Sequence, residues 1–159
     1  MLKGATGRAL GLGAISGLRS ASGPAFVSRA AAQGRLPLED TRFAFLGSPR
    51  LSKVLLVMAL GELIGDKLPV TPSRTALPSL LGRAASGGLV GAAIFASEGH
   101  RAATGGAAGA LAAVAGSFAG EQLRALAGQK TGLPDPLVAL VEDAIVLAVG
   151  SRLLQGGDA

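Results

Sequence analysis

The stretch that decides the fold is AATGGAAGALAAVAGSFAG, Ala102–Gly120, which contains no charged side chain. An α-helix needs about 20 mainly apolar residues to cross the hydrocarbon core of a bilayer. Ala102–Gly120 meets this requirement without help from any other segment. It therefore predicts a transmembrane helix.

Four further segments on either side have the same apolar character with few interruptions. They are Ala9–Ala32, Leu51–Leu68, Pro78–Ser97 and Asp135–Leu154. The first should break near Gly23-Pro24, because proline removes a backbone donor, and in a membrane the freed groups need protein or a wet cavity. We predict an all-α, polytopic transmembrane bundle of five spans, with four as the alternative, and residues 1–159 as a single integral membrane domain.

The composition agrees with a membrane location. Hydrophobic residues make up 49% of the chain and charged residues 16%, where a soluble domain carries about 25% charged residues. Aromatic residues amount to 3%, without Trp or Tyr, so the usual aromatic belt at the membrane interfaces is missing. We expect a multi-pass protein of a bacterial inner membrane.

The net charge of +5 raises the question of nucleic acid. The basic residues, however, are single and lack neighbouring aromatics for stacking, so membrane lipids are the expected partners and nucleic acid is not. The chain has no cysteine and one histidine, His100, so we expect no metal site and no cofactor.

Enzyme signatures are also absent from the sequence. It contains no phosphate-binding loop, and Gly11-Leu12-Gly13 lacks the strand that a dinucleotide site requires. Nothing favours a Ser/His/Asp triad. We expect no enzymatic activity, although lipid chemistry at Arg74 is a weaker alternative.

The positive-inside rule gives no orientation for five spans. With the N-terminus inside, seven basic residues lie inside: Lys3, Arg8, Lys67, Arg74, Arg83, Arg124 and Lys130. Seven lie outside: Arg29, Arg35, Arg42, Arg50, Lys53, Arg101 and Arg152. The balance motivates the hypothesis that the protein inserts both ways up, which reporter fusions with one exclusive orientation would rule out. A misplaced loop would give the same balance.

Glycine pairs spaced four residues apart recur along the chain. They are Gly7/Gly11, Gly13/Gly17, Gly61/Gly65, Gly87/Gly91, Gly105/Gly109 and Gly116/Gly120. Such a pair lies on one helix face and lets two backbones approach closely. We expect tight packing within the bundle and a homo-oligomer.

A faint internal repeat is present. Met58–Glu62 aligns with Val138–Glu142 at an offset of eighty residues. If these are the second and fifth spans, they run in opposite directions, as in transporters built from inverted repeats.

Charged residues inside the predicted spans are the strongest candidates for function: Arg19, Glu62, Asp66, Glu142 and Asp143. Each costs about 2.5–3.5 kcal/mol at the bilayer centre, so such residues line a pathway or pair internally. Glu62 and Asp66 share a helix face and could coordinate a cation or share a proton, with Arg19 as counter-ion. A purely structural pairing is the competing interpretation.

The loop after Leu51–Leu68 carries Ser73, Arg74 and Thr75. An arginine beside hydroxyl groups could hold a phosphate or a lipid headgroup. The simpler interpretation is a rigid interfacial turn, with the Arg74 side chain extended to the membrane surface.

Three motifs resemble a known family. They are ALGLGAISGLRSASGPA at 9–25, GELIGDKLPVTPSRT at 61–75 and LPDPLVALVED at 133–143. The sequence is similar over most of its length to a group of small integral membrane proteins designated domain of unknown function 4126. This resemblance implies a membrane location and supplies no substrate, cofactor or catalytic residue.

Two functions of different classes follow from these patterns. The first is a small channel or transporter for a proton, ion or small polar solute, with Glu62 and Glu142 on the path and Arg19 and Asp143 as charge partners. The second is a membrane scaffold or assembly protein in which glycine faces mediate association and the charges only pair.

Overall fold

The computed structural model describes residues 2–65, 73, 75–132 and 134–155, and every regular element in them is helical. The helices are α1 (Leu2–Leu18), α2 (Ser22–Ala32), η1 (a 3-10 helix, Ala44–Gly47), α3 (Pro49–Gly65), α4 (Leu77–Ser97), α5 (Ala102–Thr131) and α6 (Asp135–Gln155). The prediction of an all-α fold is confirmed for these residues. In place of the predicted first span stand two helices, α1 and α2.

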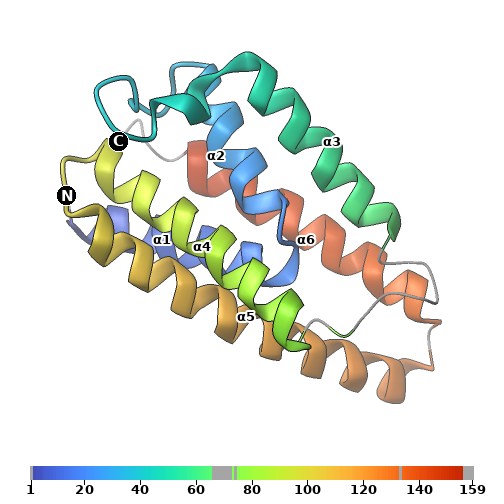
Figure 1. The fold of residues 1–159 in the computed structure, drawn as a ribbon. Coiled ribbons are helices and arrows are strands. Elements are labelled where there is room, and N and C mark those ends of the chain that lie inside the picture. The colour runs from blue at the N-terminus through green and yellow to red at the C-terminus, as the bar shows by residue number, and fades with distance from the viewer. Residues whose placement is uncertain (1, 66–72, 74, 133, 156–159) are drawn as a thin grey trace.

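These two helices run in opposite directions (Figure 1). A Cβ atom on Gly23 would lie 3.1 Å from the carbonyl oxygen of Leu12 and against the hydroxyl of Ser16, so α2 folds back onto α1. The chain breaks at residues 19–21, slightly before the predicted position. Pro24 lies in the first turn of α2, where the backbone N–H has no intrahelical acceptor to lose.

Successive helices alternate in direction. The antiparallel course of α1 and α4 follows from their contacts, since Arg8 binds Glu98 whereas Arg83 binds the carbonyl oxygen of Gly17. In Figure 1, α1, α3 and α5 begin, and α2, α4 and α6 end, at the same end of the molecule. We call this end the proximal end and the opposite one the distal end.

Close backbone contacts join α1, α4 and α5. A Cβ atom on Gly13 of α1 would lie 2.6 Å from the carbonyl oxygen of Gly109 on α5, and one on Gly116 would lie 2.6 Å from that of Ala14. A Cβ atom on Gly91 of α4 would collide with Gly105 of α5. These glycines therefore serve contacts within one chain, as small residues do in tightly packed bundles.

Other glycines face open space. A Cβ atom on Gly7, Gly61 or Gly65 would meet no atom within 4 Å. Contact between copies of the chain through the Gly61/Gly65 face of α3 stays a prediction.

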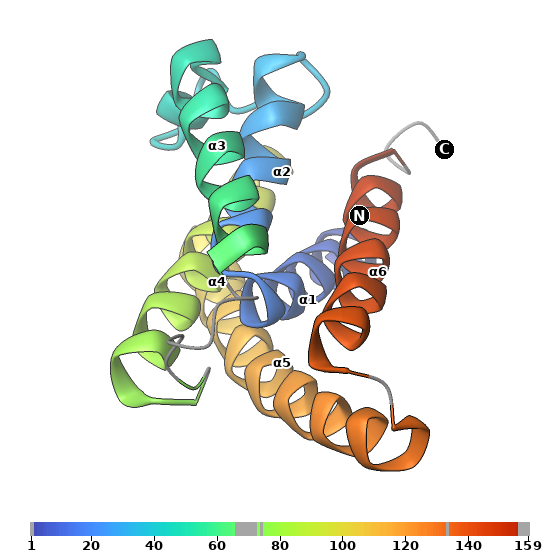
Figure 2. The ribbon, with the colours of Figure 1, turned by 90° about the vertical axis from the view of Figure 1, so that its right-hand side faces the viewer.

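The remaining helices surround the α1–α4–α5 group. Figure 2 shows α2 and α3 on one side of the molecule and α6 on the other. The segment that follows α2, together with η1, closes part of the core, because Leu36, Leu38 and Leu46 are buried. Ser28 Oγ on α2 donates a hydrogen bond of 2.6 Å to the Leu46 carbonyl on η1.

Two of the described helices, α4 and the Ala102–Lys130 part of α5, are long and apolar enough to cross a membrane. Of their most apolar windows, 39% and 22% are buried in the molecule, so these helices are not mostly enclosed core helices. α3 has 17 residues, and α6 carries Glu142 and Asp143 in its interior. The five-span bundle is therefore not confirmed.

The distribution of polarity is unusual for a protein in water. Large apolar side chains with exposed fractions above half include Val57 and Ile64 on α3, Leu111 and Leu123 on α5, and Val141 on α6. Soluble monomers rarely expose a large contiguous apolar surface.

The interior shows the opposite character. Arg19 is fully buried, and Arg83 and Asp143 are 5% and 7% exposed. Because a buried charge is costly unless it is paired, the partners of these residues are the natural place to look for a functional site.

Candidate functional site at the break between α1 and α2

The break leaves backbone N–H groups at the start of α2 without intrahelical acceptors. The carboxylate of Glu62, which α3 contributes, accepts them: Ser20 N and Ala21 N each lie 2.8 Å from a Glu62 oxygen. The Ser20 hydroxyl donates to the same carboxylate at 2.9 Å. Glu62 thus caps α2 from another helix, and its negative charge is favourable beside the positive end of the α2 dipole.

The carbonyl groups at the end of α1 are satisfied from α4 and α5. Arg83 Nη1 donates to Gly17 O at 2.7 Å and to Leu18 O at 2.8 Å. Ser117 Oγ donates to Gly17 O at 3.0 Å. The broken backbone is therefore held by side chains from neighbouring helices, which is the condition for non-helical backbone at membrane depth.

Four ionisable side chains meet at this break, and we call them the break cluster: Arg19, Glu62, Arg83 and Asp143. Arg19 forms an ion pair with Asp143 on α6, and Arg83 Nη2 lies 3.6 Å from Glu62 Oε1. Arg19 Nη1 also donates to the Glu62 carbonyl oxygen at 3.5 Å. Two positive and two negative formal charges give the cluster no net charge.

The break cluster lies inside the helical layer. With a rise of about 1.5 Å per residue, Asp143 stands about 12 Å from the start of α6 and about 18 Å from its end. Asp143 therefore lies in the middle of α6, whereas Glu62 lies near the end of α3 and Arg19 directly follows α1.

The predicted site residues separate into different places. Arg19, Glu62 and Asp143 come together at the break, whereas Glu142 faces α5 and lies 4.0 Å from Arg124. Asp66 and Arg74 lie outside the described residues.

The two predicted hydroxyl residues of the loop lie close to each other. Ser73 Oγ is 2.9 Å from Thr75 Oγ1 and donates to Glu121 Oε1 at 3.1 Å. A carboxylate beside Ser73 is unfavourable for an anion there. Among the described residues, no group of three or more His, Asp or Glu side chains could hold a metal ion.

Sequence reasoning missed Arg83 and Ser117. Arg83 was noted only as an interruption near the start of an apolar span, although an arginine within such a span was itself the signal. Ser117 gave no signal, since its role depends on the close approach of α1 to α5.

A pocket of about 650 Å³ lies between α2, α3 and α6. Its lining includes Ser22, Leu63 and Val146. Ser22 and Leu63 directly follow Ala21 and Glu62 in the chain, and Val146 lies one helical turn after Asp143. The pocket therefore reaches the residues that flank the break, and no sequence pattern indicated it.

The family model for domain of unknown function 4126 matches residues 7–153. The chain belongs to this family. The match includes most of α1, all of α2 and the four residues of the break cluster, and it confirms the resemblance found in the sequence. Comparisons with curated proteins and with solved structures returned no match. For this member of the 4126 family, function therefore has to be argued from the site.

Proposed function

We propose that this protein of the 4126 family is a multi-pass protein of a bacterial inner membrane that transports a proton, an ion or a small polar solute. The membrane placement is supported by its polarity, with apolar side chains outside and paired charges inside. In lipid, the outer surface needs no cover, and the charges avoid hydrocarbon by facing one another.

One observation carries the transport proposal: the pocket between α2, α3 and α6 reaches the turn between α1 and α2, whose backbone groups are held by ionisable side chains. In transporters, helix N-termini and non-helical backbone that face a cavity bind solute and coupling ions, and the turn between α1 and α2 offers the same groups. Here the N-terminus of α2 and the Glu62 carboxylate occupy that position.

The arrangement gives Glu62 a switching role. Its carboxylate holds the start of α2 through Ser20 and Ala21. A proton or a cation on Glu62 weakens these hydrogen bonds and the pairing with Arg83, because all of them depend on its negative charge. The tip of α2 is then free to move away from α3 and to open the pocket toward the distal end.

The order of the helices supports an inverted repeat. The units α1–α3 and α4–α6 each contain three helices, and alternating direction makes the second unit run opposite to the first. The offset of eighty residues carries α1 onto α4 and the break at 19–21 onto the turn at 98–101. Inverted repeats of this kind place the solute site where the two units meet.

A membrane scaffold is the second candidate. It is favoured by the mutual pairing of the charges in the break cluster, since paired charges can serve solely to hold helices together. Under this function the Gly61/Gly65 face, which is open in the single chain, binds another copy.

Flux measurements on purified protein in proteoliposomes distinguish the two candidates. We expect transport driven by a gradient of protons, sodium, potassium or chloride, and we expect Glu62→Gln and Asp143→Asn to reduce it to the level of protein-free liposomes. Glu142→Gln is the matched control, because Glu142 neighbours Asp143 in the chain but binds Arg124 outside the break cluster. All proteins are compared at equal monodisperse yield.

Well-folded wild-type protein that moves none of these ions would favour the scaffold. Equal flux in wild type and both cluster variants would contradict a path through the break.

A further inference from the structure

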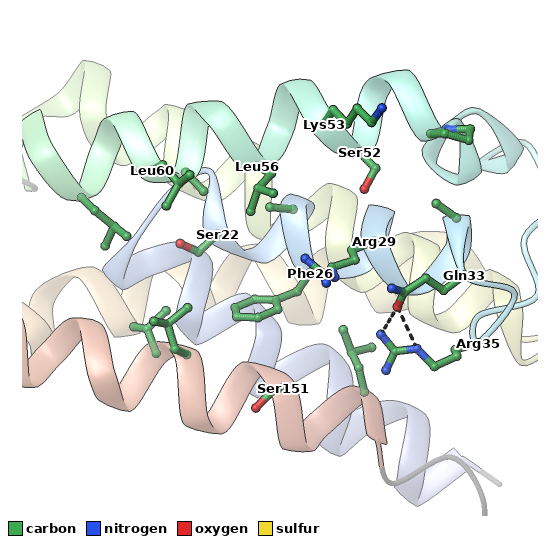
Figure 3. A pocket seen from close by; sticks show the side chains of 18 residues that line it. Ser22, Phe26, Arg29, Gln33, Arg35, Ser52, Lys53, Leu56, Leu60 and Ser151 are labelled. Atoms are coloured by element: carbon green, nitrogen blue, oxygen red, sulfur yellow. Dashed lines mark hydrogen bonds between the residues drawn. The ribbon is translucent and has the colours of Figure 1, made fainter.

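The pocket between α2, α3 and α6 has a charged end and an apolar end. Arg29, Gln33 and Arg35 gather at one end, while Leu60 lies toward the other end (Figure 3), and Lys53 adds a positive charge to the lining from α3. None of the lining residues within the described part of the chain is acidic. The charged end therefore offers an excess of positive charge to an anion.

Away from the charged end, the pocket lining is mainly apolar, with the Ser22 hydroxyl among it. Leu56, Leu60 and Leu63 of α3 face Val146 and Leu147 of α6 across the pocket. Such a surface gains most from an apolar chain, at roughly 25 cal/mol for each Å² removed from water. One occupant that fits both ends is an amphiphile with an anionic head and a hydrocarbon tail.

The charged end of the pocket lies at the proximal end of the molecule, where basic residues concentrate. Those on or beside the proximal halves of the helices are Lys3, Arg8, Arg29, Arg35, Arg42, Arg50, Lys53, Arg101 and Arg152. Among the described residues, only Arg124 and Lys130 belong to the distal end, and Arg19 and Arg83 lie in the break cluster. The positive-inside rule then places the proximal end in the cytoplasm.

With the proximal end in the cytoplasm, the amphiphile would come from the cytoplasmic leaflet of the membrane. Anionic phospholipids give the cytoplasmic leaflet its negative surface potential, and basic pockets between transmembrane helices on that side bind their headgroups. Resting on the membrane placement proposed above, we propose that this pocket binds an anionic phospholipid of the inner leaflet. Its headgroup contacts Arg29 and Arg35, with Lys53 nearby, and one acyl chain lies along Leu56 and Leu60.

A lipid in this position reaches the transport site. Its acyl chain ends beside Ser22 and Leu63, next to the Ser20, Ala21 and Glu62 contacts that hold α2. Bound lipid therefore supports the α2–α3 contact from the side of the pocket, and the protein of the 4126 family depends on anionic lipid for stability.

The test is a titration of the detergent-solubilised protein followed by native mass spectrometry. The probes are phosphatidylglycerol, phosphatidylcholine with the same acyl chains, palmitate and inorganic phosphate. We expect phosphatidylglycerol to bind most tightly. Replacing Arg29, Arg35 and Lys53 by Gln should weaken it by roughly fivefold for each charge removed.

The control replaces Arg42, Arg50 and Arg101 by Gln, which removes the same charge from the same end without changing the pocket lining. This control should bind phosphatidylglycerol within about twofold of wild type. If the triple variant of the pocket does not fold, Ser52→Glu adds a negative charge to the pocket lining and should weaken binding in the same way.

Several outcomes overturn the proposal. Equal binding of phosphatidylcholine and phosphatidylglycerol would mean that the pocket does not recognise the negative charge of the headgroup. Tighter binding of palmitate than of phosphatidylglycerol would mean that the pocket binds a free fatty acid. If inorganic phosphate at equal concentration displaces phosphatidylglycerol, the site binds the anionic group alone and the acyl chain does not contribute. If both triple variants lose the same affinity for phosphatidylglycerol, the lipid is attracted only by the positive charge of the proximal end in general.

The binding measurement is independent of flux. Lipid binding without flux would contradict the proposed transport alone, and flux without selective lipid binding would contradict this inference alone.

Discussion

At the scale of single residues, neighbouring carboxylates on α6 have different environments. Asp143 pairs with the fully buried Arg19, whereas Glu142 lies 4.0 Å from Arg124, and both side chains of that second pair keep some exposure. Removing one partner of a buried ion pair leaves an uncompensated charge, which costs about 3–5 kcal/mol. Losing a partly exposed pair typically costs about 1 kcal/mol or less.

We therefore expect Asp143→Asn to destabilise the protein by about 3–5 kcal/mol and Glu142→Gln by about 1 kcal/mol at most. Reversible unfolding in mixed micelles with increasing SDS measures both. Similar losses for the two variants would contradict the assignment of Asp143, rather than Glu142, to the break cluster.

The same residues mark how far the sequence alone could lead. Arg19, Glu62 and Asp143 were identifiable because a charge in an apolar span needs a partner. Which carboxylate pairs with which arginine was not, since Asp143 stands 124 positions after Arg19. Only the packing of α6 against α1 brings the two together.

At the scale of helices, the apolar segments and turn residues of the sequence predict most of the elements. The observed break at 19–21, however, lies closer to the N-terminus than the break predicted near Gly23-Pro24. Pro24 suggested a break at its own position, yet a proline is tolerated in the first turn of a helix. The actual break at 19–21 depends on Glu62, Arg83 and Ser117, which are distant in sequence. Local propensity contains no information about such partners.

Glycine contacts between helices give a prediction in which two identical substitutions have opposite effects. Gly13→Ala places a Cβ atom 2.6 Å from the backbone of α5, so the helices must separate, at a cost of about 1–3 kcal/mol. Gly61→Ala meets no atom within 4 Å and raises helix propensity, which stabilises α3 by roughly 0.5–1 kcal/mol.

Thermal unfolding of both variants in the same detergent checks this pair. Destabilisation by Gly61→Ala as large as that by Gly13→Ala would mean that the α3 face is itself a packed interface, as in a homo-oligomer.

At the scale of the whole molecule, the reversal of α2 changes the distribution of charge. Five spans with one broken helix divide the basic residues evenly, seven to seven, as the sequence predicted. With α1 and α2 antiparallel, nine basic residues belong to the proximal end and, among the described residues, two to the distal end. Arg83 now counts with the break cluster, and Lys67 and Arg74, which the even count included, lie outside the described residues. Under the proposed membrane placement, the turn at 19–21 therefore leads us to expect a cytoplasmic proximal end, where the even count gave no orientation.

The most direct test of a path to the break uses the absence of native cysteine. Ser22→Cys introduces a thiol where the pocket meets the break, and Ser16→Cys introduces one that is buried among helices and does not line the pocket. The reagent is the membrane-impermeant anion 2-sulfonatoethyl methanethiosulfonate, added to sealed vesicles from either side. In sealed vesicles of phosphatidylcholine, where no anionic phospholipid fills the pocket, we expect Ser22→Cys to react from the cytoplasmic side and Ser16→Cys to remain unmodified, because the open pocket leads from the basic end to the break. Ser22→Cys that is as inert as Ser16→Cys from both sides, in folded protein, would contradict that path.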